Sequence, residues 1–426
     1  MIGLPQITLV ALLAGLFLPT LPFYFKIASS LALGVATFSI LLLIFSMPFS
    51  KIRVSRTAFF CVLAAFIYVF CHLVFVRGLS SVAYTRAFYS FLPLALMVLA
   101  ADVFGQMLWR LPPERLRTQI STVFYVCVGI GIIGLLFAAL DLRLGDWRAP
   151  LFPFTEPSVY VLFISPFVLF VAASRLRRGV LIFLFLALAV LFFRGSAVMA
   201  VLLILASSLY PKRLTMAVIP LLLGGVILAS SAVWGYYLDR AQFWNSDNLS
   251  ALVYRQGLEI ARESLVGENL TGVGFQQLGL TEIEVQATDI IRDLREGADM
   301  NERDGGFVAA KLLGELGLFG LPLTLFLIYN FGRSFLQLRA HASRARPLDS
   351  HLVFLNCCIL AFSIDFLFRG VGYFTLNSVL IIMSMLLLYR VRKVYRRGGR
   401  ARFGSSRYGG IQAPGSMVSP ERMRLR

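Results

Sequence analysis

Long apolar segments separated by short polar ones follow one another along the chain to about residue 390. A helix needs roughly 20 apolar residues to cross the hydrocarbon core of a bilayer, and most of these segments approach that length. One run, Val180–Leu209, is too long for a single upright helix. It is interrupted only at Arg194-Gly195-Ser196, which predicts two spans joined by a tight turn. The other predicted spans are Leu4–Phe25, Ile27–Phe49, Ala58–Phe75, Tyr84–Phe104, Ile120–Leu140, Val159–Ala173, Ala217–Gly235, Phe307–Phe331, Leu352–Phe368 and Tyr373–Tyr389. The pattern predicts an all-α, polytopic membrane protein of about twelve transmembrane helices.

Basic residues fix the predicted orientation. The short loops that begin at Lys51, Arg110, Arg175, Lys212 and Arg333 all lie on one side of the membrane and together hold fifteen Lys and Arg residues. Loops rich in Lys and Arg stay in the cytoplasm, so both chain ends are predicted to be cytoplasmic. The tail, 393–426, is rich in Arg, Gly and Ser, which favours a disordered segment that touches anionic lipid over an RNA-binding one.

The one long loop on the opposite side has the reverse charge. Residues 236–306 contain thirteen acidic residues and six arginines, for a formal net charge near −7. Ser250–Ser264 and Asp289–Glu296 show helical spacing, so we expect a small folded cap, and long loops are usually functional. The predicted organisation is nine spans in 1–235, the outer loop in 236–306, three spans in 307–392 and the basic tail in 393–426.

Composition excludes several classes of protein. The chain has 426 residues, 58% hydrophobic and only 15% charged, whereas a soluble domain has about a quarter charged. The net charge of +18 could suggest nucleic acid, but the basic residues lie in loops between apolar segments. All five cysteines lie within apolar runs, without metal-type spacing. We therefore predict neither a metal nor a cofactor, and Leu4–Phe25 is predicted to be a retained helix, without a signal-peptide cleavage pattern.

Arginines at the outer membrane boundary are the strongest indication of function. Val180–Phe193 rises only about 21 Å as a helix, so the Arg194 turn is predicted to lie at or below the outer headgroups. Arg369 follows another span, and Arg86 begins one. Charged groups at such depth are functional candidates, and the planar guanidinium matches phosphate oxygens. Snorkelling and structural ion pairs are the alternatives, especially for Arg369, since Asp365 lies one helical turn before it.

Other candidate residues have simpler alternatives. Glu156, in Thr155-Glu156-Pro157-Ser158, and Asp304, before the helix of Lys311 and Glu315, could both be helix caps. Gly272-Val273-Gly274 could allow close backbone approach to a ligand, although a lone G-x-G is a weak signal. His72 is predicted within a span, and the outer loop has no histidine, so a general base there would be a carboxylate, Tyr or Lys. Asp304 and Glu156 are the predicted candidates.

The order of these features resembles the O-antigen polymerase and ligase superfamily of bacterial polysaccharide assembly. The resemblance covers roughly residues 155–320. Its motifs are Thr155-Glu156-Pro157-Ser158, Arg194-Gly195-Ser196, Arg255 with Gly272-Val273-Gly274, Asp304-Gly305-Gly306-Phe307 and Lys311-Leu312-Leu313-Gly314-Glu315-Leu316-Gly317-Leu318-Phe319-Gly320.

The resemblance implies a metal-independent membrane glycosyltransferase of GT-C-like architecture in the bacterial inner membrane. Its substrates would be oligosaccharides on undecaprenyl pyrophosphate, with a chain-length regulator as a further partner of this class. Arg194 and Arg255 would hold the diphosphate, together with Arg369 and Arg86, and Asp304 would accept the proton of the acceptor hydroxyl. Ligases typically have a histidine in the outer loop, so its absence favours a polymerase. A transporter or flippase of the same helix count is the alternative from another class, although we find no internal repeat.

Overall fold

The structure is a computed structural model, and it is all-helical, without strands, over the residues that it describes. These are residues 3–28, 30–49, 52–76, 81–144, 154, 156–194, 197–210, 244, 248–266, 270–280, 283–297, 303–345 and 348–402. The all-α prediction is confirmed for this part of the chain.

The helices of the first half follow the predicted spans closely. They are α1 (Leu4–Phe17), α2 (Leu21–Tyr24), α3 (Ala32–Ser46), α4 (Arg56–Val76), α5 (Ser81–Trp109), α6 (Pro113–Leu144), α7 (Pro157–Ala173), α8 (Arg177–Arg194) and α9 (Ala197–Leu209). α8 ends and α9 begins on either side of the predicted Gly195-Ser196 turn. The predicted span Ala217–Gly235 lies outside the described residues.

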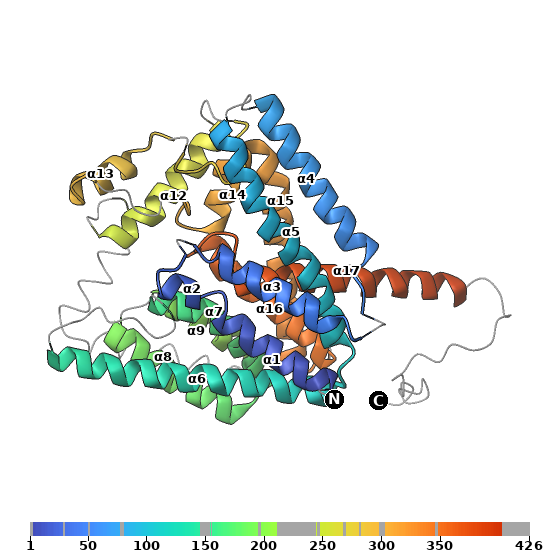
Figure 1. The fold of residues 1–426 in the computed structure, drawn as a ribbon. Coiled ribbons are helices and arrows are strands. Elements are labelled where there is room, and N and C mark those ends of the chain that lie inside the picture. The colour runs from blue at the N-terminus through green and yellow to red at the C-terminus, as the bar shows by residue number, and fades with distance from the viewer. Residues whose placement is uncertain are drawn as a thin grey trace. The chain divides into compact units, whose positions relative to one another are not determined.

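The second half begins with the predicted outer loop, which contains α12 (Leu249–Val266) and α13 (Gln286–Leu294). α12 packs against both α13 and the next helix, α14 (Val308–Leu316), as Figure 1 shows. A 3₁₀ turn, η1 (Gly317–Phe319), joins α14 to α15 (Gly320–Ala342), and α16 (Ser350–Leu367) and α17 (Leu376–Arg402) follow.

Within the part of the chain that the structure describes, six segments are long and apolar enough to cross a membrane. They are Leu4–Tyr24, Arg56–Val74, Tyr84–Trp109, Pro113–Phe137, Val308–Ala342 and Ser350–Leu367. Three shorter apolar helices, α3, α7 and α9, accompany them. The chain is therefore a helical membrane protein, and the total of twelve spans stays a prediction.

α7 and α16 form the interior of the bundle. Nearly every side chain of both helices is buried, and the two pack against each other. A helix that is apolar on all sides is stable only when other helices or lipid surround it. The neighbours α6, α8, α9 and α15 surround α7, which explains why 17 residues suffice for this helix.

Two predicted spans are broken in the structure. Leu4–Phe25 is divided into α1 and α2. We predicted a single helix over Phe307–Phe331, but the helical path changes direction at Gly317, whose φ is +55°. Only glycine adopts this backbone region at little cost. α15 alone has 23 residues, or about 34 Å of helix, which is enough to span a bilayer. α14 is therefore a separate short helix at one end of α15.

The start of the predicted disordered tail also needs correction. α17 continues to Arg402, past residue 392, because the Arg and Lys residues there are good helix formers. The residues after 402 lie outside the described part.

Candidate functional site

A cavity of about 500 Å³ lies where the outer loop meets the helical bundle. The described residues that line it come from six regions of the chain. They are Thr20, Phe23, Ser30, Leu31, Ala32, Arg86, Ser90, Glu156, Val159, Gln276, Leu280, Arg303, Asp304, Lys311, Arg369, Gly370, Val371, Gly372, Tyr373 and Phe374. Four of the six residues singled out in the sequence line this one cavity: Arg86, Glu156, Asp304 and Arg369.

Positive charge dominates the lining. Four basic side chains face two acidic ones, so the formal charge of the described lining is +2. Arg303 and Lys311 are the basic residues that the sequence analysis did not assign to a site. Their positions directly beside Asp304 and within the Lys311–Gly320 motif were the available signals. A low-dielectric cavity of this charge is suited to an anionic ligand.

Arg369 and Glu156 form an ion pair within this lining. The Arg369 Nη2 atom donates to Glu156 Oε2 at 3.0 Å, and the Ser158 hydroxyl donates to the same oxygen at 2.9 Å. The side chain of Glu156 makes no capping bond to α7. The pairing of Arg369 with Asp365 that local spacing suggested is not found, because Asp365 accepts a hydrogen bond from Asn377 of α17.

Asp304 lies beside Lys311. The two charged atoms are 3.9 Å apart, and the Asp304 side chain is 45% exposed, whereas that of Lys311 is 3% exposed. Arg86 of α5 lies close enough to Asp304 and Arg303 for their charges to act on it. The turn before α14 therefore presents the partly exposed Asp304 carboxylate among three cations, Arg86, Arg303 and Lys311.

Stacking and close backbone contacts hold the turn that carries Asp304. Tyr254 of α12 stacks on Phe307 with ring centroids 5.0 Å apart. A Cβ at Gly306 would lie 2.5 Å from the Val253 backbone oxygen, so this position needs glycine. Burial raises the pKa of the Tyr254 hydroxyl above its ordinary value, which leaves the carboxylates as the better candidates for a general base.

The Gly272-Val273-Gly274 segment makes main-chain hydrogen bonds to the end of α14. Val273 N donates to Gly314 O at 2.9 Å, and Gly274 N donates to Glu315 O at 2.8 Å. These bonds satisfy carbonyl groups at the end of α14 that the helix itself leaves unpaired. The close backbone approach at the two glycines is to the motif that carries Lys311, and the approach to a ligand stays a prediction.

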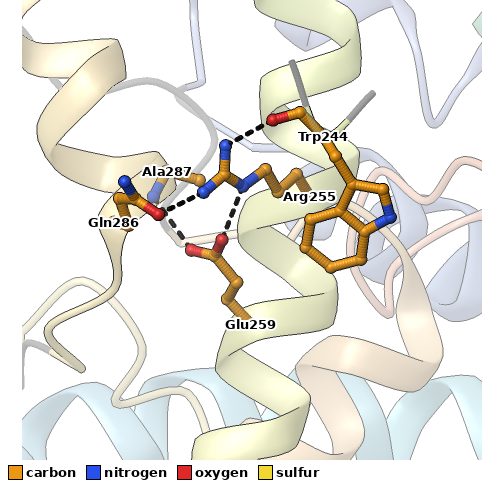
Figure 2. Close-up of polar contacts among 5 residues, drawn as sticks. All are labelled: Trp244, Arg255, Glu259, Gln286 and Ala287. Carbon is orange, nitrogen blue, oxygen red and sulfur yellow. Dashed lines mark hydrogen bonds and ion pairs between the residues drawn. The ribbon is translucent and has the colours of Figure 1, made fainter. Parts of the chain in front are cut away.

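Arg255 has a different surrounding from the one predicted. It is not among the described residues that line the cavity. Figure 2 shows its guanidinium between α12 and α13, where it donates to Glu259 (2.6 Å), to the Trp244 backbone oxygen (2.9 Å) and to Gln286 (2.5 Å). Glu259 also accepts a bond from Ala287 N at the start of α13. The guanidinium thus holds α13 on α12, and the role with the diphosphate that the resemblance implies for Arg255 stays a prediction.

Arg194 and His72 are two further residues that the sequence analysis discussed. Arg194 ends α8 as predicted, but its side chain lies outside what the structure describes. His72, near the end of α4, is within 2.7 Å of the Thr271 backbone oxygen, so a histidine from a predicted span does contact the outer loop. It is not among the described lining residues of the cavity.

The described residues include no group of three or more His, Cys, Asp or Glu side chains that could hold a metal ion. Comparison of the whole chain with known proteins finds no matching family model and no matching curated protein. The chemistry of the cavity is therefore the basis for assigning a function.

Proposed function

We propose that this protein is a membrane glycosyltransferase that acts on glycans linked to a polyprenyl pyrophosphate, and that it is a polysaccharide polymerase. The observation that carries the proposal is the cavity of about 500 Å³ with four basic side chains, next to helices that are apolar enough for a membrane. A lipid diphosphate combines a long apolar tail with a strongly negative headgroup. The two properties match the bundle and the cavity, respectively.

The basic side chains have a specific role in this proposal. Arg86, Arg303 and Arg369 bind the oxygens of the diphosphate, for which guanidinium groups offer planar sets of donors. The same groups stabilise the negative charge that grows on the diphosphate as it leaves. Stabilisation of developing charge by preorganised donors is usually the largest single contribution to catalysis.

Asp304 is the proposed general base. In the reaction, the bond between the anomeric carbon and the diphosphate oxygen breaks, and its electron pair leaves with the diphosphate. A bond forms between the same carbon and the acceptor hydroxyl oxygen, and the hydroxyl proton passes to Asp304. Glu156 is less suited to this role, because Arg369 and Ser158 already occupy one of its oxygens.

The apolar part of the lining supports a lipid-linked substrate. Phe23, Leu31, Val159 and Phe374 contribute to the same cavity as the charged residues. A diphosphate held there would have its tail beside apolar helices. We place the cavity at the periplasmic face of a bacterial inner membrane, with both chain ends in the cytoplasm, on the basis of the loop charges.

A polymerase is favoured over the related alternatives. A ligase of the resembling superfamily typically has a histidine in its outer loop, and residues 236–306 contain none. A flippase would need a path through the bundle and no chemical step. A chain-length regulator would be a partner of the polymerase only.

The test is incubation of the purified protein with undecaprenyl-pyrophosphate-linked repeat units, followed by gel analysis of the glycan. A ladder of products is expected, and both Arg86→Ala and Arg369→Ala should suppress it while the protein still inserts into the membrane. Transfer of a single block to a lipid acceptor would identify a ligase. Movement of substrate across vesicles without a covalent change would contradict the proposal and identify a flippase.

A further inference from the structure

Lys311 lines the cavity although it is almost completely buried. Its side chain is 3% exposed, and its Nζ atom donates to the Arg303 backbone oxygen at 2.5 Å. The ammonium also lies 5.2 Å from the centre of the Tyr373 ring. A cation–π contact of this kind holds the ammonium in place without using its N–H groups on an oxygen acceptor.

The Lys311 ammonium has more donors than the described residues accept. An ammonium has three N–H donors, and the Arg303 oxygen is its one hydrogen-bond acceptor in the described part of the chain. Glu315 Oε1 is 3.7 Å away and Asp304 Oδ1 is 3.9 Å away, beyond the roughly 2.7–2.9 Å of a charge-assisted hydrogen bond. Two donors therefore remain for a group inside the cavity.

Among the described residues, Glu315 is the carboxylate nearest to the Lys311 ammonium. Its side chain is fully buried, one helical turn after Lys311. The Gln276 main chain and the Tyr373 side chain lie beside this carboxylate, although neither of its oxygens has a well-formed hydrogen bond to a described residue. The 3.7 Å spacing between Lys311 and Glu315 leaves the ammonium able to bind an anion in the cavity as well.

Gly372 leaves open space beside Asp304 and Lys311. Its φ is +83°, and a Cβ added there would lie 3.2 Å from Asp304 Oδ1 and 4.0 Å from Lys311 Nζ. Because residue 372 is a glycine, no side chain from this position fills the space next to the Asp304 carboxylate and the Lys311 ammonium. A phosphate oxygen could reach the ammonium from this side.

We propose that Lys311 is a direct ligand of the substrate's diphosphate and that Glu315 positions it. This inference rests on the proposed function and names a binding residue that the sequence motifs alone did not assign. In this arrangement Lys311 supplies a fixed and almost fully buried point charge. The arginines, which are more exposed, supply the planar donors.

Binding of inorganic pyrophosphate to the purified protein in detergent tests this inference by calorimetry. Loss of a hydrogen bond to a charged group corresponds to roughly a ten- to hundredfold loss of affinity, which is the result expected for Lys311→Met. Lys311→Arg should recover part of the loss. Arg262→Met is the matched control, since Arg262 is exposed on α12 and outside the described lining of the cavity.

A second measurement uses the unaltered protein, because a variant at a buried position can fail to fold. The chain has only five lysines, so acylation of each can be followed by peptide mass spectrometry. Pyrophosphate should slow the modification of Lys311 and leave that of the exposed Lys26 unchanged. Equal protection by inorganic phosphate at the same concentration would overturn the assignment to a diphosphate.

The results separate this inference from the proposed function. If Arg369→Ala weakens pyrophosphate binding but folded Lys311→Met binds like the wild type, or if Lys311 is not protected, the inference is wrong and the proposed function stands. If the wild type makes no polymer and binds no pyrophosphate, the proposed function and the inference both fail.

Discussion

Replacing Glu156 by glutamine should strengthen the binding of pyrophosphate. In the ligand-free structure the Glu156 carboxylate occupies a donor of Arg369 at 3.0 Å, so an incoming phosphate oxygen must compete with it. Glutamine has nearly the same shape, and it removes the competing charge. The substitution therefore changes the competition at Arg369 with little change in packing.

The expected gain is small because both side chains touch solvent. Glu156 is 49% exposed and Arg369 is 20% exposed, and exposed ion pairs contribute about 0.2–1 kcal/mol. Release of Arg369 from that pair corresponds to roughly a 1.4- to fivefold tighter dissociation constant. The gain should shrink as salt is added, since salt screens exposed charges.

Calorimetric titration with pyrophosphate at low and at moderate salt measures this effect. Glu284→Gln is the control, because it removes the same charge from an exposed position of the outer loop outside the described lining. An equal gain in the control would mean a long-range charge effect. Weaker binding by Glu156→Gln would refute the reasoning, since Glu156 would then orient Arg369 for the ligand and not compete with it.

Three other substitutions have distinct expected outcomes. Asp304→Asn should lower the polymerisation rate by about 10²–10⁴-fold, with pyrophosphate affinity retained, as steady-state kinetics would show; an unchanged rate would exclude Asp304 as the base. Arg255→Met should destabilise the outer loop by about 1–3 kcal/mol, because it leaves the partly buried Glu259 carboxylate without its ion-pair partner, and faster proteolysis of the loop measures this. A loss of pyrophosphate affinity in folded Arg255→Met would instead support its predicted role. Gly306→Ala should lower the melting temperature, since a side chain at φ +73° that meets the Val253 oxygen costs about 1–3 kcal/mol; an unchanged melting temperature would show that the turn relaxes freely.

Apolar run length predicted most of the helices, since the bilayer dictates both the length and the composition of a span. It could not predict the break at Gly317, because a single glycine within an apolar run does not reveal its φ angle. The extension of α17 was also missed. A sequence rich in Arg and Gly suggests disorder by composition, whereas its arginines favour a helix locally.

Arg86 and Arg369 could be predicted as site residues because a charged group at the membrane boundary is costly unless it has a function or a partner. Both line the cavity. Local spacing then suggested the wrong partner for Arg369. Asp365 lies one turn away along the chain, but its carboxylate faces Asn377 of another helix. For Arg255 the sequence did contain a signal, since Glu259 lies four residues later, at the distance of a helical ion pair. The contribution of Gln286, some thirty residues away, could come only from the fold.

Main-chain hydrogen bonds join residues 270–274 to the end of α14, with Val273, Gly274 and Leu318 donating to carbonyl oxygens across the joint. Every amino acid except proline supplies the main-chain atoms of such bonds, so the joint places few demands on side chains beyond the two glycines. Swinging the outer loop away would expose the carbonyl groups of Gly314 and Glu315 and would release the helix that carries Lys311. An opening of the cavity at this joint would therefore break main-chain hydrogen bonds, whereas the walls around Phe23 and Leu31, around Arg86 and around Glu156 have no main-chain hydrogen bond to α14 among the described bonds.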